Sequence, residues 1–390
     1  MTAPAYRGPQ ESAGSSQAPN GPVVFLHIGE PKTGTTFLQG VLWNNRNELA
    51  RAGIALAGHR QQDAFRAVQD IRGVPQAGND PAGTWQGEWD ILADQARRAT
   101  GTVVISVEQM AAMTRRQAER AVRSLEPAEV HVVVTLRDFA TLLPAEWQET
   151  IKHANRGGWQ DWLTHIIERA GRDHRRSGCW FWEVHDTVAV LARWAPYVPA
   201  ERIHVVSMPP RAKPAGLLWE RFASVIGVDP GVADTSRTFP NASLGMAEVE
   251  LLRRVNKALP VGLPMWFYVI EVKEELAHSV LAKRRGKAAV RLPAERLEWA
   301  EKEADRIINE VLAAGYDVVG DLDEIRPLPA AAGGTRPGDV AAEDMLDGAV
   351  ELIATLVQRL YRDSQAPTAT LPSLTVAQRK RVLRRAKSTV

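Results

Sequence analysis

Apolar residues in this chain form short continuous runs separated by longer stretches of helical periodicity. The runs cover residues 22–28, 53–57, 102–106, 131–136 and 202–207, and they are rich in valine and isoleucine. Continuous apolar runs of this length are typical of strands buried on both faces of a parallel sheet. The sequence therefore predicts at least five such strands.

The stretches between these runs carry apolar residues at helical spacing. Helices are predicted at 35–50, 62–72, 85–99, 115–125 and 142–153, and further helices over much of 217–312. Strands that alternate with helices indicate a parallel sheet with helices on both faces. In such a sheet, ligands bind beyond the carboxyl ends of the strands, so the residues that follow each strand are the candidates for function.

Both ends of the chain differ in composition from this α/β region. Residues 1–20 are rich in Pro, Ser, Gly and Ala and read as a disordered leader, and residues 331–339 read as a Gly- and Pro-containing linker. A helix at about 340–362 and a basic tail make residues 340–390 a helical, basic C-terminal extension, whose helix is a candidate partner-binding arm. The tail reads as a solvated surface or as a contact for an acidic lipid or polymer. One main α/β domain, residues 21–330, remains between the leader and the linker.

Composition narrows the class of protein further. The formal net charge is +2, which does not favour nucleic acid as a partner. The single cysteine, Cys179, excludes an internal disulfide framework, favours the cytoplasm and reads as a buried, inert thiol. No apolar run reaches the length of a membrane span.

The segment after the first predicted strand carries the clearest chemical signal. It reads Gly-Glu-Pro-Lys-Thr-Gly-Thr-Thr and covers residues 29–36, between a strand and a predicted helix. Glycines allow backbone N–H groups to approach an anion, and the helix N-terminus adds positive potential. Lys32 contributes a full charge, and the hydroxyls of Thr33, Thr35 and Thr36 are further donors. This order predicts a phosphate-binding loop.

The spacing of the loop is close to that of kinases and ATPases, with one difference. In those proteins the lysine follows the second glycine, whereas here Thr35 follows Gly34 and the lysine stands inside the loop. No predicted strand ends clearly in the aspartate expected to hold magnesium. A nucleoside-triphosphate enzyme is therefore the weaker alternative.

Residues 31–36, Pro-Lys-Thr-Gly-Thr-Thr, resemble the 5'-phosphosulfate-binding loop of the sulfotransferases that use 3'-phosphoadenosine 5'-phosphosulfate (PAPS). The resemblance is to a divergent bacterial-type branch and extends weakly over residues 21–330. It implies a P-loop-like central parallel sheet flanked by helices, and transfer of a sulfuryl group from PAPS without a metal. It also implies that Lys32, Thr33, Gly34, Thr35 and Thr36 bind the donor, and that 3',5'-adenosine bisphosphate is released.

A second family element binds the 3'-phosphate of PAPS through an arginine at a strand end and a downstream serine. Arg137 and Asp138 resemble its start, but Phe139 replaces the family proline and Ala145 stands where the serine is expected. An ion pair with Asp138 is the structural alternative for Arg137. Substitute donors for the serine are Gln148, Lys152 and the basic segment 283–287, and Trp147 on the same predicted helix is a candidate to pack beside the donor.

A hydroxyl acceptor requires a general base. Glu108 follows the strand 102–106, where cytosolic family members carry a catalytic histidine, and His59 follows the strand 53–57, near the position of a catalytic glutamate in glycan-modifying members. Glu108 is slightly preferred; its alternative role is to stabilise a helix N-terminus, and that of His59 is an exposed turn. Ordinary surface or capping roles are expected for Asp63, Glu30 and His153.

Lys32 is the strongest catalytic candidate, because it is placed to neutralise charge on the leaving oxygen. The acceptor, a small molecule, saccharide or lipid, is not specified by the sequence, and oligomerisation is left open. A phosphotransferase and a nucleotide-binding module without catalysis are the competing functions.

Overall fold

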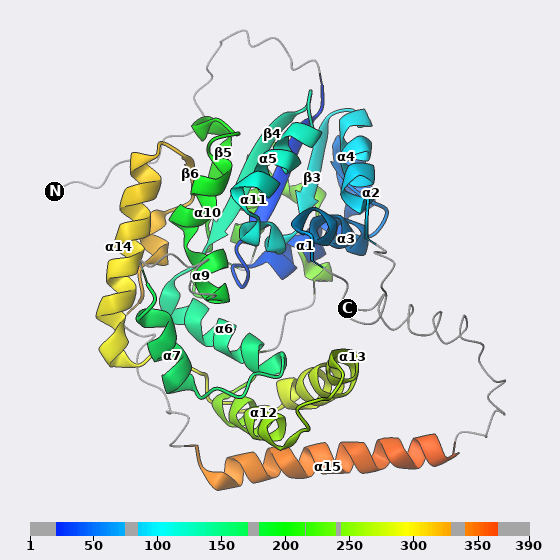
Figure 1. Ribbon diagram of the computed structural model, residues 1–390, viewed down its shortest axis with the longest axis vertical. Coiled ribbons are helices and arrows are strands. Elements are labelled where there is room, and N and C mark those ends of the chain that lie inside the picture. Colours follow the sequence, from blue (N-terminus) through cyan, green and yellow to red (C-terminus); the bar gives the residue numbers. More distant parts are fainter. Residues whose placement is uncertain are drawn as a thin grey trace.

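The computed structural model describes residues 21–74, 85–170, 179–214, 216–238, 243–328 and 340–365. These residues form an α/β protein with a central parallel sheet flanked by helices, as the sequence predicts (Figure 1). The predicted leader, the linker and the basic tail lie outside the described residues. The division into domains remains a prediction.

The sheet has six parallel strands in the order β2-β3-β1-β4-β5-β6. Strand β1 lies between β3 and β4, so the segment that leaves its carboxyl end is surrounded by the ends of its neighbours. The strands are β1 Val23–Gly29, β2 Ile54–Leu56, β3 Thr102–Ser106, β4 Glu129–Leu136, β5 Ile203–Ser207 and β6 Asp317–Val319.

Both faces of the sheet are buried, which explains the continuous apolar runs. Along β1, Val24, Leu26 and Ile28 pack into the larger core, whereas Phe25 packs into a smaller core on the opposite face. The smaller core is covered by α1 Thr35–Asn44, α2 Arg46–Arg51 and α11 Leu217–Val225.

Most of the remaining helices pack against the larger core. They are α3 Gln61–Arg72, α4 Glu88–Arg98, α5 Arg115–Ser124, α6 Phe139–Lys152, α7 Trp159–Ile167, α9 Trp180–His185, α10 Thr187–Trp194, α12 Met246–Ala258, α13 Met265–Tyr268, η5 Val269–Val280, α14 Leu297–Ala313 and α15 Ala342–Gln365. Short 3₁₀ turns are η1 Glu108–Ala112, η2 Ala200–Arg202, η3 Pro230–Val232, η4 Thr235–Arg237, η6 Leu281–Lys283, η7 Ala294–Arg296 and η8 Leu322–Ile325.

The helix predicted over 35–50 is wrong in one respect: two helices meet there at Asn45. The Asn45 side chain donates to the Val41 carbonyl and to the Asp234 carbonyl, and it accepts from the Asp234 N–H. Asparagine readily bonds to backbone groups in this way, and the contact with a distant loop fixes the break.

The tryptophans are mainly core residues, as expected from their spacing, and Trp147 is one of them. It is fully buried, and its ring centre lies 5.4 Å from that of Trp159. This burial contradicts the idea that Trp147 packs beside a donor. Cys179 is free and buried, and burial raises the pKa of its thiol, as expected for an inert cysteine.

A candidate anion-binding site at the end of strand β1

The segment 30–34 connects β1 to α1 at the carboxyl edge of the sheet, as the sequence predicts. Its backbone has positive φ at Gly29, Lys32 and Gly34, with values of 110°, 59° and 91°. A Cβ atom on Gly34 would lie 2.3 Å from Cδ2 of the buried Leu218, so this position has room only for glycine. The turn directs the chain into α1, whose first N–H groups have no partner within the helix.

Threonine hydroxyls hold this loop against the neighbouring strand. Thr33 is buried, its hydroxyl donates to the Glu30 carbonyl at 2.5 Å, and it lies 2.5 Å from the hydroxyl of Thr135 on β4. Thr35 is buried in the first turn of α1, whereas Thr36 is exposed. Thr33 therefore has a structural role, while Thr36 remains accessible from outside.

Arg137 and Lys32, which are far apart in the sequence, meet at this edge of the sheet. Arg137 Nη1 donates to the Lys32 carbonyl at 3.0 Å, and Nε donates to the Thr141 hydroxyl at 2.7 Å. Burial lowers the pKa of Arg137 despite the nearby charge of Asp138. Asp138 instead caps α6 by accepting from the Thr141 N–H at 2.9 Å. The guanidinium thus braces the loop.

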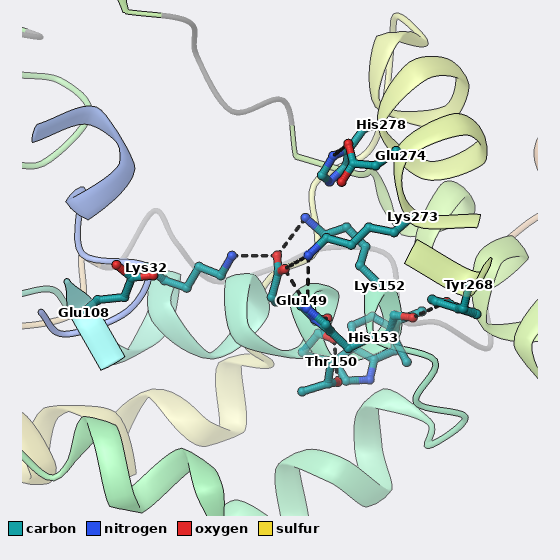
Figure 2. Close-up of polar contacts among 12 residues, drawn as sticks. Lys32, Glu108, Glu149, Thr150, Lys152, His153, Tyr268, Lys273, Glu274 and His278 are labelled. Atoms are coloured by element: carbon teal, nitrogen blue, oxygen red, sulfur yellow. Dashed lines mark hydrogen bonds and ion pairs between the residues drawn. The ribbon is translucent and has the colours of Figure 1, made fainter. Parts of the chain in front are cut away.

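The ammonium group of Lys32 is paired with Glu149 on α6, as Figure 2 shows. Lys32 Nζ lies 2.6 Å from Glu149 Oε2, and Lys152 and Lys273 contact the same carboxylate at 2.9 and 3.2 Å. Burial alone would raise the pKa of Glu149, but the three lysines hold it well below its usual range. Glu149 is therefore an ionised counter-ion and a poor base.

Glu108 lies directly beside the loop. It opens η1 after β3, and a Cβ atom on Gly29 would come within 3.1 Å of the Glu108 Cβ. Gln39 on α1 donates to Glu108 Oε2 at 2.8 Å, and Gln109 donates to Oε1 at 3.1 Å. Gln61 in turn donates to Gln39 Oε1 at 3.0 Å. These amides fix a carboxylate at the edge of the candidate site.

His59 lies in the turn after β2, and strand β3 lies between β2 and β1, the strand from which the loop leaves. Its side chain is exposed, and it lines a pocket of about 220 Å³ with Arg46, Gly58 and Gln95. None of the residues that line this pocket belongs to the loop 29–36. The described contacts do not bring His59 to Lys32, so its role as a base remains a prediction.

The predicted substitutes for the missing serine have different surroundings. Gln148 accepts from the Leu244 N–H at 3.1 Å, and Arg284 forms ion pairs with Glu248 and Glu351. Lys287 donates to the Ser243 carbonyl at 2.8 Å and to the Ala282 carbonyl. Of these candidates, only Lys152 joins the cluster that contains Lys32.

Asp63 and Glu30 differ in how well they fit their expected ordinary roles. Asp63 caps α3 and pairs with Arg66 at 2.5 Å, so the capping role is confirmed. The surface role expected for Glu30 is wrong, because this residue is almost fully buried. Glu30 accepts from the Thr187 hydroxyl at 2.5 Å and lies 3.3 Å from Nδ1 of His185.

A buried ionic triad beneath the loop was not foreseen. His185 is fully buried, and its Nε2 lies 3.3 Å from Glu146 Oε1 while its Nδ1 faces Glu30. Burial alone would lower the pKa of His185, but contacts with Glu146 and Glu30 outweigh it and raise the pKa to about 9. The protonated His185 side chain therefore links α9 to the loop through Glu30 and to α6 through Glu146.

Within the ranges that the structure covers, no group of three or more His, Cys, Asp or Glu side chains is arranged to hold a metal ion. None of the helices in those ranges is long and apolar enough to cross a membrane.

The fold defines the class: an α/β protein with a P-loop-like parallel sheet and a strand–loop–helix segment that is a candidate anion site. No protein-family model matches the chain, and no curated protein matches it. Among solved structures, it is similar to a sulfotransferase from Alicyclobacillus acidocaldarius at 16% sequence identity and a TM-score of 0.34. The match covers 62% of this chain and 94% of that one. Similarity at this level assigns no family.

Proposed function

We propose that this chain is a sulfotransferase that moves a sulfuryl group from PAPS to a hydroxyl or amine of an acceptor. The observation that carries the proposal is the segment 31–36 in its strand–loop–helix setting, with the Arg137 guanidinium 3.0 Å from the Lys32 carbonyl. A loop that we propose binds phosphate and an arginine from the next strand, β4, thereby lie together. This pairing suits a donor that carries anions at both its 5' and 3' positions.

In the proposed complex, the 5'-phosphosulfate lies on the N-terminus of α1, within reach of Lys32 and Thr36. Arg137 is the candidate for the 3'-phosphate, with Ala145 supplying no hydroxyl. On donor binding, Lys32 turns toward the phosphosulfate, and its three N–H donors allow one to stay on Glu149. Glu149 then holds the lysine in place before the donor arrives.

The reaction breaks the bond between sulfur and the bridging oxygen of PAPS and forms a bond between sulfur and the acceptor oxygen or nitrogen. Negative charge grows on the leaving phosphate oxygen, and Lys32 with the loop N–H groups stabilises it. The acceptor proton must pass to a base, and Glu108 is the preferred candidate because its carboxylate is fixed next to Gly29. His59 is the second candidate, with a position farther from the loop.

The proposal is tested by incubating the protein with PAPS labelled in its sulfuryl group and a crude metabolite extract, in buffer that contains EDTA. Transfer of label to any extract component supports a metal-independent sulfotransferase. Label transfer from ATP labelled at the γ position, only with magnesium, would instead support a phosphotransferase. Tight binding of 3',5'-adenosine bisphosphate without transfer would support a nucleotide-binding module that lacks catalysis.

A further inference from the structure

The cluster around Glu149 holds more positive charge than its single carboxylate balances. Lys32, Lys152 and Lys273 all contact Glu149, at 2.6, 2.9 and 3.2 Å. The side chains of Lys152 and Lys273 are only 12% and 14% exposed. Partly buried charges are costly unless they are paired, so three ammonium groups around one carboxylate favour the binding of a further anion.

The neighbouring groups do not balance this charge. Burial and the charge of Lys273 lower the pKa of His153, whose Nε2 lies 3.0 Å from Lys273 Nζ. Burial and the charge of Lys152 likewise lower the pKa of His278, which contacts the half-exposed Glu274 at 3.3 Å. Among the described residues, Lys152 and Lys273 form no ion pair with a carboxylate other than Glu149.

The secondary structure that presents Lys273 is itself uncommon. Lys273 lies on η5, a π-helix of 12 residues, whereas π-helices are rare and occur frequently at functional sites. Figure 2 shows Glu149 between Lys32 on one side and Lys152 and Lys273 on the other. An anion bound by Lys152 and Lys273 therefore lies farther from the loop than the Lys32 ammonium group does. Because Lys32 is assigned to the donor, Lys152 and Lys273 remain for the second substrate, the acceptor.

We infer that Lys152 and Lys273 bind an oxyanion carried by the acceptor, such as a carboxylate, sulfate or phosphate group. This inference rests on the proposed function and narrows its substrate class to acceptors that are already anionic. Until substrates bind, Glu149 holds the lysines in place. Its negative charge also weakens the binding of any anion that does not displace the Glu149 carboxylate from the lysines. The recognition is electrostatic and compact, as lysine provides a point charge rather than a planar fork.

Inorganic sulfate serves as the probe, titrated into protein saturated with 3',5'-adenosine bisphosphate at constant ionic strength. We expect saturable binding by the wild type and at least about tenfold weaker binding by the double variant Lys152→Gln, Lys273→Gln, since losing charge-assisted contacts costs about 1.4 kcal/mol or more. In the single variant Lys273→Gln, whose lysine is not among the candidates for the 3'-phosphate, affinity for the bisphosphate should change less than about threefold, well under that 1.4 kcal/mol. Lys302→Gln, on the exposed face of α14, is the matched control.

Sulfate affinity that is absent in the wild type, or unchanged in the double variant, would overturn the inference. An equal loss of bisphosphate affinity would assign the two lysines to the donor instead. Binding of the bisphosphate is measured separately, and the sulfate titration is repeated without bisphosphate. A complete lack of bisphosphate binding marks a failure of the proposed function, whereas a lack of sulfate binding marks a failure of the anion site.

A second, independent observation concerns α15. One face of this helix packs on the protein through Met345 and Leu352, and Arg359 pairs with Glu271. Figure 1 shows α15 along the bottom of the molecule, below α12. Another face carries large apolar side chains that are 56–65% exposed, namely Leu346, Val350, Ile353, Val357, Leu360 and Tyr361.

The first five of these residues follow one another at intervals of four, three, four and three positions. This is the heptad spacing of a seam between two helices. Acidic residues lie in the first half of the helix, namely Glu343, Asp344, Asp347 and Glu351, whereas Arg362 lies in its last turn and Arg359 already pairs with Glu271. Two copies of α15 in antiparallel orientation therefore bring opposite charges together.

We propose that α15 pairs with α15 of a second copy of this chain in a twofold-symmetric, antiparallel dimer. Such an interface is isologous, because each half of the helix contacts the opposite half of its partner. Burial of a continuous seam explains why so many apolar side chains are exposed in the single chain.

Sedimentation at micromolar concentration measures this association. The wild type is expected to sediment as a dimer and the double variant Ile353→Glu, Val357→Glu as a monomer, with unchanged circular dichroism. Gln358→Glu, outside the seam, should leave the dimer intact. A monomeric wild type, including one that binds lipid vesicles instead, or a dimeric double variant would refute the proposal.

Discussion

Replacing Lys32 by methionine is expected to lower the rate of sulfuryl transfer about 100-fold or more, the loss typical for removal of one preorganised donor at a developing charge. Methionine keeps the length of the side chain and removes only the ammonium group. Because the Lys32 ammonium group pairs with Glu149, the variant also leaves that carboxylate with two lysine partners. Rates are measured with labelled PAPS and the extract component that accepts the label.

The matched control is Lys302→Met, whose lysine is exposed and, within the described ranges, pairs with Glu298 on the same helix. It should retain the wild-type rate. Full transfer by the Lys32 variant would contradict the assigned role of this residue, even if the sulfotransferase activity itself were present. Circular dichroism and thermal unfolding of both variants show whether a loss of transfer is merely the result of a loss of folding.

The second large effect is expected from His185→Gln, which should lower the free energy of unfolding by about 3–5 kcal/mol. The substitution removes the cation that lies between two buried carboxylates, Glu30 and Glu146, and leaves both without an ionic partner. Urea denaturation at pH 6.5 measures the loss. Adding Glu146→Gln to this variant should restore part of the stability, because one of the uncompensated charges is then absent.

The same triad sets a pH dependence. The folded-state pKa of His185 is about 9, above the ordinary value of 6.5, so its stabilising effect is complete below pH 6.5 and is lost as the pH rises through 9. The free energy of unfolding of the wild type should fall over this range, and the fall should be smaller in His185→Gln. Parallel pH curves for the two proteins would show that His185 is not charged in the folded state.

Much of the fold follows from local pattern. The strands at the centre of the sheet are continuous apolar runs because both of their faces are covered, and these are predicted within two residues of their observed ends. Strand β6 was not predicted, since it is only partly buried, whereas the equally short edge strand β2 has two buried residues. The break between α1 and α2 was missed because it depends on Asn45 bonding to Asp234, a contact between distant segments.

The site divides in the same way. The loop at 30–34 and the strand-end position of Arg137 could be predicted, because backbone geometry and strand order determine them. The role of Glu149 could not be predicted. A glutamate three positions before Lys152 indicates an ordinary ion pair within a helix, and the contacts with Lys32 and Lys273 come from other elements. No sequence motif around His185 indicated its role. Its role arises from Glu30 and Glu146, which lie far from it in the sequence.

We propose above all that the loop after β1 binds the 5' end of an adenosine donor without a metal. Isothermal titration of 3',5'-adenosine bisphosphate into the protein in EDTA tests it most directly. We expect saturable one-to-one binding that weakens at least about tenfold, or by about 1.4 kcal/mol, in Lys32→Met and is unchanged in Lys302→Met. No binding at millimolar bisphosphate, or equal binding by wild type and Lys32→Met, would contradict it.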